Sequence, residues 1–218
     1  MKIAGLWNSH DCSFCVLEDG VPTIHAELER YTREKEPKGD SFKLFKQVRG
    51  EENDIDYWVT CSPADSFKNG SKRCVKVSDK FNHEIYSVGH HQAHAANAFF
   101  TSNFEEALIV TIDGGGIDNT NGSLHDKSDI DTVKNSFVTC TTFWSGKGNK
   151  INPIHMISNG MLNLGKDWSM CTSKIFGLGT WRDPRGDQAG TVMGMAALGD
   201  SEKYGRLGLT PAVQITTS

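Results

Sequence analysis

Two histidines one helical turn apart, followed by an apolar run that ends in an aspartate, most restrict how this chain folds. The histidines are His90 and His94, and the aspartate is Asp113. Positions i and i+4 lie on one face of a helix, with Cβ atoms about 5–6 Å apart. Alanines surround the histidine pair, so this helix is able to pack closely against a neighbour. The pattern predicts a helix over about 90–101 and a strand over 107–112.

These three side chains form a candidate metal site. Two imidazoles and one carboxylate suit iron(II), zinc or manganese and leave coordination positions for substrate or water. Asp113 follows the carboxyl end of the predicted strand, and open α/β sheets usually bind their ligands at the carboxyl ends of strands. His91 is a weaker candidate because it points about 100° away from His90 on a helix. The alternative is that His90 and His94 are ordinary core or surface residues, as histidine pairs at this spacing often are.

Three glycines, Gly114, Gly115 and Gly116, follow the aspartate directly. Glycine lets the backbone turn sharply and approach a ligand closely. The N–H groups of these residues are therefore candidates for binding a phosphate. A tight turn without a ligand is the alternative.

Length and composition narrow the function classes. The 218 residues suffice for one large domain or for one and a half domains of about 100–150 residues. The net charge is −4, and lysines and arginines form no stripe, so nucleic acid is not an expected partner. The amino terminus does not read as a signal peptide, and no run approaches the ~20 apolar residues of a membrane span. We expect a cytoplasmic protein without membrane contact.

The six cysteines include one CxxC pair and no second pair at metal-ligand spacing. Reduced, mostly structural thiols are therefore the preferred interpretation.

The order of predicted elements indicates an α/β fold. An Asp-Gly pair between apolar runs at residues 19–20 predicts a hairpin in an opening meander of three strands. The predicted strands are 2–8, 13–18, 21–26, 55–61, 84–88, 107–112 and two more within 122–145; helical patterns are a charged start at 27–35, then 90–101 and 159–178. The order β-β-β-α-β-α is that of the actin, sugar-kinase and Hsp70 class, which is ribonuclease H-like. We expect an actin-like first subdomain over 1–145 and a helical segment over 146–218 that leads to a missing second half.

From about residue 3 to residue 199, the chain resembles the amino-terminal domain of the NodU/CmcH carbamoyltransferases. The most specific similarities are to the family's HHxAHAxxAF and DGxG motifs. The segments that carry the resemblance are 5–13, 29–35, 89–99, 112–116, 159–179 and 190–196.

The resemblance implies a two-stage reaction. A carboxyl-terminal domain would make carbamoyl-adenylate from carbamoyl phosphate and ATP, and this module would pass the carbamoyl group to a hydroxyl acceptor. The family's iron is held by residues that match His90, His94 and Asp113, together with an aspartate from beyond this chain, so iron(II) is favoured over zinc or manganese. The further ligand and the other half of the fold would come from a missing carboxyl-terminal half or a separate partner chain.

Three further residues receive roles. His10 is the candidate catalytic residue, because an imidazole with a pKa near ~6.5 can position the carbamoyl group or remove the acceptor's proton. Its alternative is a turn-capping histidine. Arg33 and Lys35 are candidates for neutralising phosphate oxygens, and a solvated surface is the alternative for this charged run.

Some positions depart from the family's pattern. Glu36 stands where the family tends to have histidine, and Ile117 stands where it has an acidic residue. Ala189 and Thr191 stand where the family's Glu-Gly-Lys triplet has its glutamate and its lysine. These departures keep open a non-catalytic or decayed nucleotide- and metal-binding module. A metal-dependent hydrolase that activates water at the His-His-Asp site is the second alternative.

Overall fold

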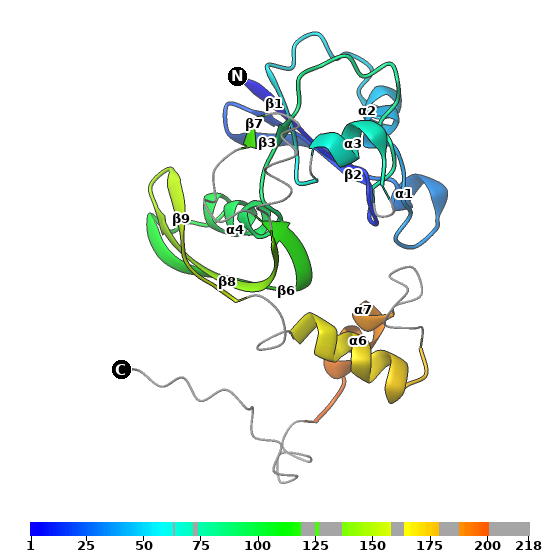
Figure 1. Cartoon of the computed structure of the whole chain (residues 1–218), viewed down its shortest axis with the longest axis vertical. Coiled ribbons are helices and arrows are strands. Elements are labelled where there is room, and N and C mark those ends of the chain that lie inside the picture. The colour runs from blue at the N-terminus through cyan, green and yellow to red at the C-terminus, as the bar shows by residue number, and fades with distance from the viewer. Residues whose placement is uncertain are drawn as a thin grey trace.

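The computed structural model describes residues 1–62, 64–71, 74–118, 125–126, 137–157, 164–178 and 188–200 (Figure 1). The strands are β1 (Lys2–Trp7), β2 (Ser13–Glu18), β3 (Val21–Glu27), β4 (Tyr57–Thr60), β5 (Tyr86–Ser87), β6 (Glu106–Asp118), β7 (His125–Asp126), β8 (Phe137–Lys147) and β9 (Lys150–Ile157). The helices are α1 (Glu29–Thr32), α2 (Ser41–Val48), α3 (Ala64–Asn69), α4 (His90–Phe100), α6 (Leu164–Lys174) and α7 (Ala189–Ala196).

The first sheet has the strand order β3-β2-β1-β4-β5-β7. Strands β1, β2 and β3 form the predicted antiparallel meander, and β4 runs parallel to β1 on its other edge. At the β2–β3 turn, Asp19 has φ 49° and Gly20 has φ 84°. Positive φ at both central residues is what a type I′ hairpin turn requires. The Asp-Gly hairpin and the mixed α/β class are therefore confirmed.

A core of aromatic and aliphatic side chains joins this sheet to α2. Phe14 of β2 and Trp58 of β4 are buried against Phe42 and Phe45 on one face of the helix. Asp40 caps α2: its carboxylate accepts hydrogen bonds from the N–H of Phe42 (3.0 Å) and from that of Ser78 (2.8 Å). The loop after β1 is tied to the same helix, because the Asn8 side-chain oxygen accepts a hydrogen bond from the Ser41 N–H at 2.9 Å.

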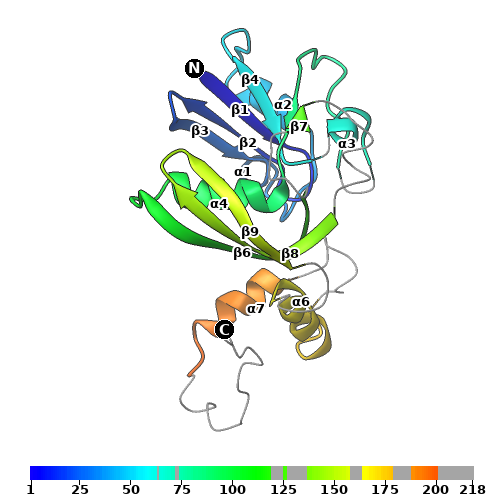
Figure 2. The same cartoon turned by 60° about the vertical axis from the view of Figure 1, so that its left-hand side comes forward.

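The second sheet, β6-β8-β9, is antiparallel, and α4 lies across one of its faces (Figures 1 and 2). Ala95 and Phe99 of α4 are buried against Ile109 and Trp144 of the sheet. The Trp144 indole N–H donates to the Thr111 hydroxyl at 3.1 Å, so this buried polar group is satisfied. This packing holds α4 against β6.

Several elements differ from the expectation. Helices α2 and α3 are not among the predicted elements, and β9 occupies Lys150–Ile157, where a helical segment was expected from residue 146. The β8–β9 turn at Gly148, with φ 56°, continues the sheet instead. The division at residue 145 stays a prediction, and β8 runs through that position.

Parts of the predicted second strand pair and of the 159–178 helix lie outside the described residues. Within the part of the chain that the structure describes, no helix has both the length and the apolar composition needed to cross a bilayer.

Candidate metal centre

The structure brings together the three predicted metal ligands. The Nε2 atom of His90 lies 2.6 Å from Oδ2 of Asp113 and 3.1 Å from Nε2 of His94. The Nε2 atom of His94 lies 3.5 Å from the same carboxylate oxygen. Helix α4 supplies both imidazoles from adjacent turns, and β6 supplies the carboxylate.

The spacing of these atoms fits a shared cation. Ligand atoms held about 2.1 Å from one metal ion are about 3.0–3.4 Å apart in tetrahedral or octahedral arrangements. Two of the three distances, 3.1 and 3.5 Å, are close to that range, and the third, 2.6 Å, is a hydrogen bond. The side chains of His90, Asp113 and His94 are 17%, 38% and 55% exposed. The group is therefore anchored on one side and open to solvent on the other.

Asp113 lies in a β-bulge, which corrects the predicted strand end at residue 112. Strand β6 continues to Asp118, and its pairing with β8 shifts register between Ile112 and Gly116. Such a bulge adds a local bend that re-aims a side chain, and bulges are over-represented beside active sites. Gly115 has φ 148°, which favours glycine. The bulge, and not a turn after the strand, directs the carboxylate toward α4.

Two glycines permit close packing around the carboxylate. A methyl group on Gly116 would overlap the Cγ and Cδ2 atoms of the His90 ring. A methyl group on Gly165, in α6, would overlap the backbone nitrogen of Gly114. The glycine run therefore has a packing role of its own, and phosphate binding by Gly114, Gly115 and Gly116 stays a prediction.

The electrostatics favour the ionised carboxylate. Burial alone would raise the pKa of Asp113, but hydrogen bonds from His90 and His94 outweigh it and hold that pKa well below its usual range. A deprotonated carboxylate is the form that binds a metal ion.

Trp7, at the end of β1, lies near both His10 and one of the three candidate ligands. The ring of Trp7 lies 6.0 Å from the His10 ring and 6.4 Å from the His90 ring. The Trp7 indole N–H donates to the backbone carbonyl of His10 at 2.6 Å. The Nδ1 atom of His10 lies 2.7 Å from a carboxylate oxygen of Asp11. Sequence reasoning missed Trp7, although an aromatic residue at the end of β1, directly before a polar turn, was an available signal.

The remaining candidates from the sequence, Arg33, Lys35 and His91, are not among the three residues that converge. Arg33 and Lys35 are exposed on the segment after α1, where Arg33 has φ 62°, and their role in phosphate binding stays a prediction. His91 is fully buried, and its ring lies 5.3 Å from the His90 ring.

Residues 65–205 match the protein family described as carbamoyltransferase N-terminus, and this segment includes all three candidate ligands. The chain belongs to this family. The carbamoyltransferase amino-terminal domain is actin-like, in agreement with the predicted fold class and the mixed α/β structure.

Two further relatives have no assigned activity. An uncharacterized protein of Methanocaldococcus jannaschii is 28% identical over 120 residues, which is 52% of this chain and 22% of that protein. An uncharacterized protein of Synechocystis sp. is 38% identical over 64 residues, or 29% of this chain and 7% of that protein. The chain thus spans less than a quarter of the length of either relative.

Proposed function

We propose that this chain is the amino-terminal module of an O-carbamoyltransferase, which passes a carbamoyl group from carbamoyl-adenylate to a hydroxyl of a small molecule. Carbamoyl phosphate and ATP would supply the adenylate in another part of the protein or in a partner chain. The observation that carries the proposal is the convergence of His90, His94 and Asp113 within the family's matched region.

His90, His94 and Asp113 would hold a divalent cation, with iron(II) assigned ahead of zinc and manganese from the family resemblance. When bound, such a cation acts as a Lewis acid that stabilises charge developing on a carbamoyl or phosphate oxygen. The open side of the group leaves room for that oxygen.

We assign His10 the role of general base. Because its Nδ1 faces the Asp11 carboxylate, which can only accept, Nδ1 carries the proton in the neutral ring and Nε2 has a free lone pair. Nε2 would take the proton of the acceptor hydroxyl as the acceptor oxygen bonds to the carbamoyl carbon and AMP leaves. Trp7 positions this loop through its hydrogen bond to the His10 carbonyl. The N–H groups of residues 114–116, with Arg33 and Lys35, would hold the phosphate of the adenylate.

Metal binding is the first test. Equilibrium dialysis of the chain against iron(II), zinc and manganese, without oxygen for iron, should give one bound equivalent. His90→Ala and Asp113→Asn should weaken binding at least 100-fold, whereas His25→Ala, at an exposed position on β3, should match the unaltered chain. If all variants bound the metal as tightly as the unaltered chain, the assignment of these ligands would be refuted.

Carbamoyl transfer is the second test. The chain, together with a domain or partner chain that makes carbamoyl-adenylate, should move label from [¹⁴C]carbamoyl phosphate to hydroxyl compounds when ATP is present, and His10→Ala should lower kcat at least 100-fold. Metal binding without transfer to any acceptor would support the non-catalytic module instead. Ester hydrolysis that requires no carbamoyl donor would support the hydrolase.

A further inference from the structure

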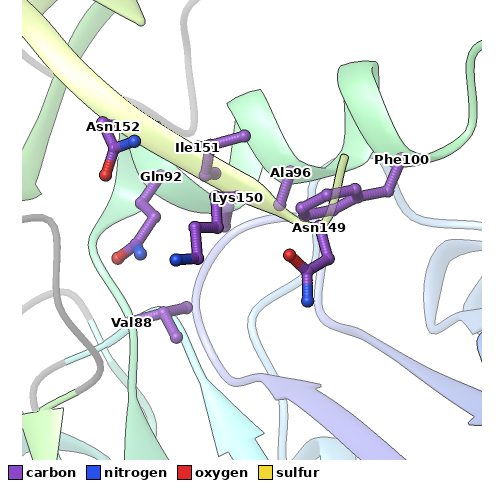
Figure 3. A pocket seen from close by; sticks show the side chains of 9 residues that line it. Val88, Gln92, Ala96, Phe100, Asn149, Lys150, Ile151 and Asn152 are labelled. Carbon is purple, nitrogen blue, oxygen red and sulfur yellow. The ribbon is translucent and has the colours of Figure 1, made fainter. Parts of the chain in front are cut away.

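A pocket of about 380 Å³ opens between α4 and the β8–β9 hairpin (Figure 3). One wall consists of α4 residues that include Gln92, Ala96 and Phe100, and the other consists of hairpin residues that include Lys150 and Asn152. Its volume is within the roughly 300–1,000 Å³ of small-molecule sites.

This pocket is separate from the candidate metal centre. Gln92 is two positions from both His90 and His94, and a two-residue step rotates about 200° around a helix. None of the three ligands is among the residues that line the pocket, which therefore occupies a different face of α4 from the imidazoles. An occupant would contact the helix without contacting the three ligands.

The two ends of the pocket differ in chemistry. Figure 3 shows the Lys150 ammonium and the Gln92 amide reaching the same part of the opening from opposite walls, with the Asn152 amide nearby. No acidic residue is among those that line the pocket. At the other end, the Phe100 ring, 51% exposed, lies beside Ala96, with the Asn149 amide next to them. One end thus offers donors and a positive charge, and the other offers an apolar surface bordered by one amide.

We propose that this pocket binds a small molecule in which a carboxylate or phosphate is attached to a flat apolar group. The anion would lie at Lys150 and accept hydrogen bonds from the amides of Gln92 and Asn152, because charge-assisted hydrogen bonds are the stronger kind. The flat group would lie against Ala96 and Phe100. This site does not depend on the proposed carbamoyl transfer.

Phenyl phosphate and benzoate are suitable probes, titrated into the ¹⁵N-labelled chain while the backbone amide shifts are followed. At least one anion should give saturable shifts centred on α4 and the start of β9. The anion that binds more tightly shows whether the pocket prefers a phosphate or a carboxylate. Benzyl alcohol, which lacks a charge, should bind at least tenfold more weakly. Equal binding of benzyl alcohol would overturn the assignment of an anion.

Matched variants locate the site. Lys150→Gln should weaken anion binding at least tenfold, whereas Lys147→Gln should change it less than twofold, since Lys147 is in the same hairpin but pairs with Glu106 at 2.8 Å. Ala96→Leu should fill the apolar end and weaken binding, and Ala98→Leu, at an exposed position outside the lining, should not.

Absence of saturable shifts with both anions would overturn the proposal. Equal effects of Lys150→Gln and Lys147→Gln would do the same. An unchanged amide spectrum in the absence of probe verifies that each variant is folded, so lost binding reflects the pocket.

Discussion

At the scale of single residues, the candidate metal centre depends on the glycines around it as much as on its three ligands. Asp113 reaches the imidazoles because its neighbours lack Cβ atoms, and Gly116 lies directly against the His90 ring. The burial of Cys12 is a second residue-scale feature with a chemical consequence.

Replacing Gly116 with alanine should weaken metal binding about 10- to 100-fold, the range seen when groups that orient metal ligands are altered. The added methyl would force the His90 ring away from Asp113. Isothermal titration with zinc measures the affinity. Gly190→Ala adds a methyl where no atom lies within 4 Å and should leave the affinity unchanged. Equal affinities for both variants would contradict this account of Gly116.

Cys12 should resist alkylation. Burial, assisted by the nearby Asp40 carboxylate, raises the pKa of the Cys12 thiol to about 12, and the thiolate is the reactive form. Because the folded-state pKa is above the unfolded value of about 8.5, the associated stability is present below that pH and is lost as the pH rises toward 12. Iodoacetamide at pH 8, followed by peptide mass spectrometry, should label the partly exposed Cys171 and leave Cys12 unmodified. Comparable labelling of the two would refute this prediction.

At the scale of elements, α4 and β6 carry the site, and the sequence indicates both. The spacing of His90 and His94 predicts the helix, and the apolar run before Asp113 predicts the strand, because each signal is local. The β-bulge was not predictable in the same way, since it depends on pairing between Ile112–Gly116 and a strand more than twenty residues away. Strand β9 was missed because Pro153 interrupts a short and partly polar run.

Phe99→Ala should destabilise the chain by about 3–5 kcal/mol, the usual range for truncating a buried aromatic side chain. Phe99 is 3% exposed in the core between α4 and the second sheet, whereas its neighbour Phe100 is 51% exposed. Phe100→Ala should therefore lower stability by much less, about 1 kcal/mol or under. Urea denaturation followed by circular dichroism measures both, and similar losses would show that α4 is not held through Phe99.

At the scale of the whole molecule, the candidate metal centre belongs to the layer of the second sheet and lies near the first. The ligands come from α4 and β6, and the ring of Trp7, at the end of β1 in the first sheet, lies 6.4 Å from the His90 ring. A cation that binds only the folded arrangement stabilises all of these elements together.

Metal should therefore raise the melting temperature of the chain. At a free concentration 100 times the Kd, binding adds about 2.7 kcal/mol to the free energy of unfolding. For a chain of this size, that corresponds to a rise of roughly 5–10 °C. Scanning calorimetry with and without metal measures the rise, and His94→Ala should abolish it. A metal-dependent rise that persists in His94→Ala would place the stabilising ion elsewhere.

The contact between Gly165 and Gly114 has a mechanical consequence. Main chain meets main chain there, with no flexible side chain between them to absorb movement. A displacement of α6 would therefore act directly on the peptide that follows Asp113, and the seating of this helix is one determinant of where the carboxylate lies.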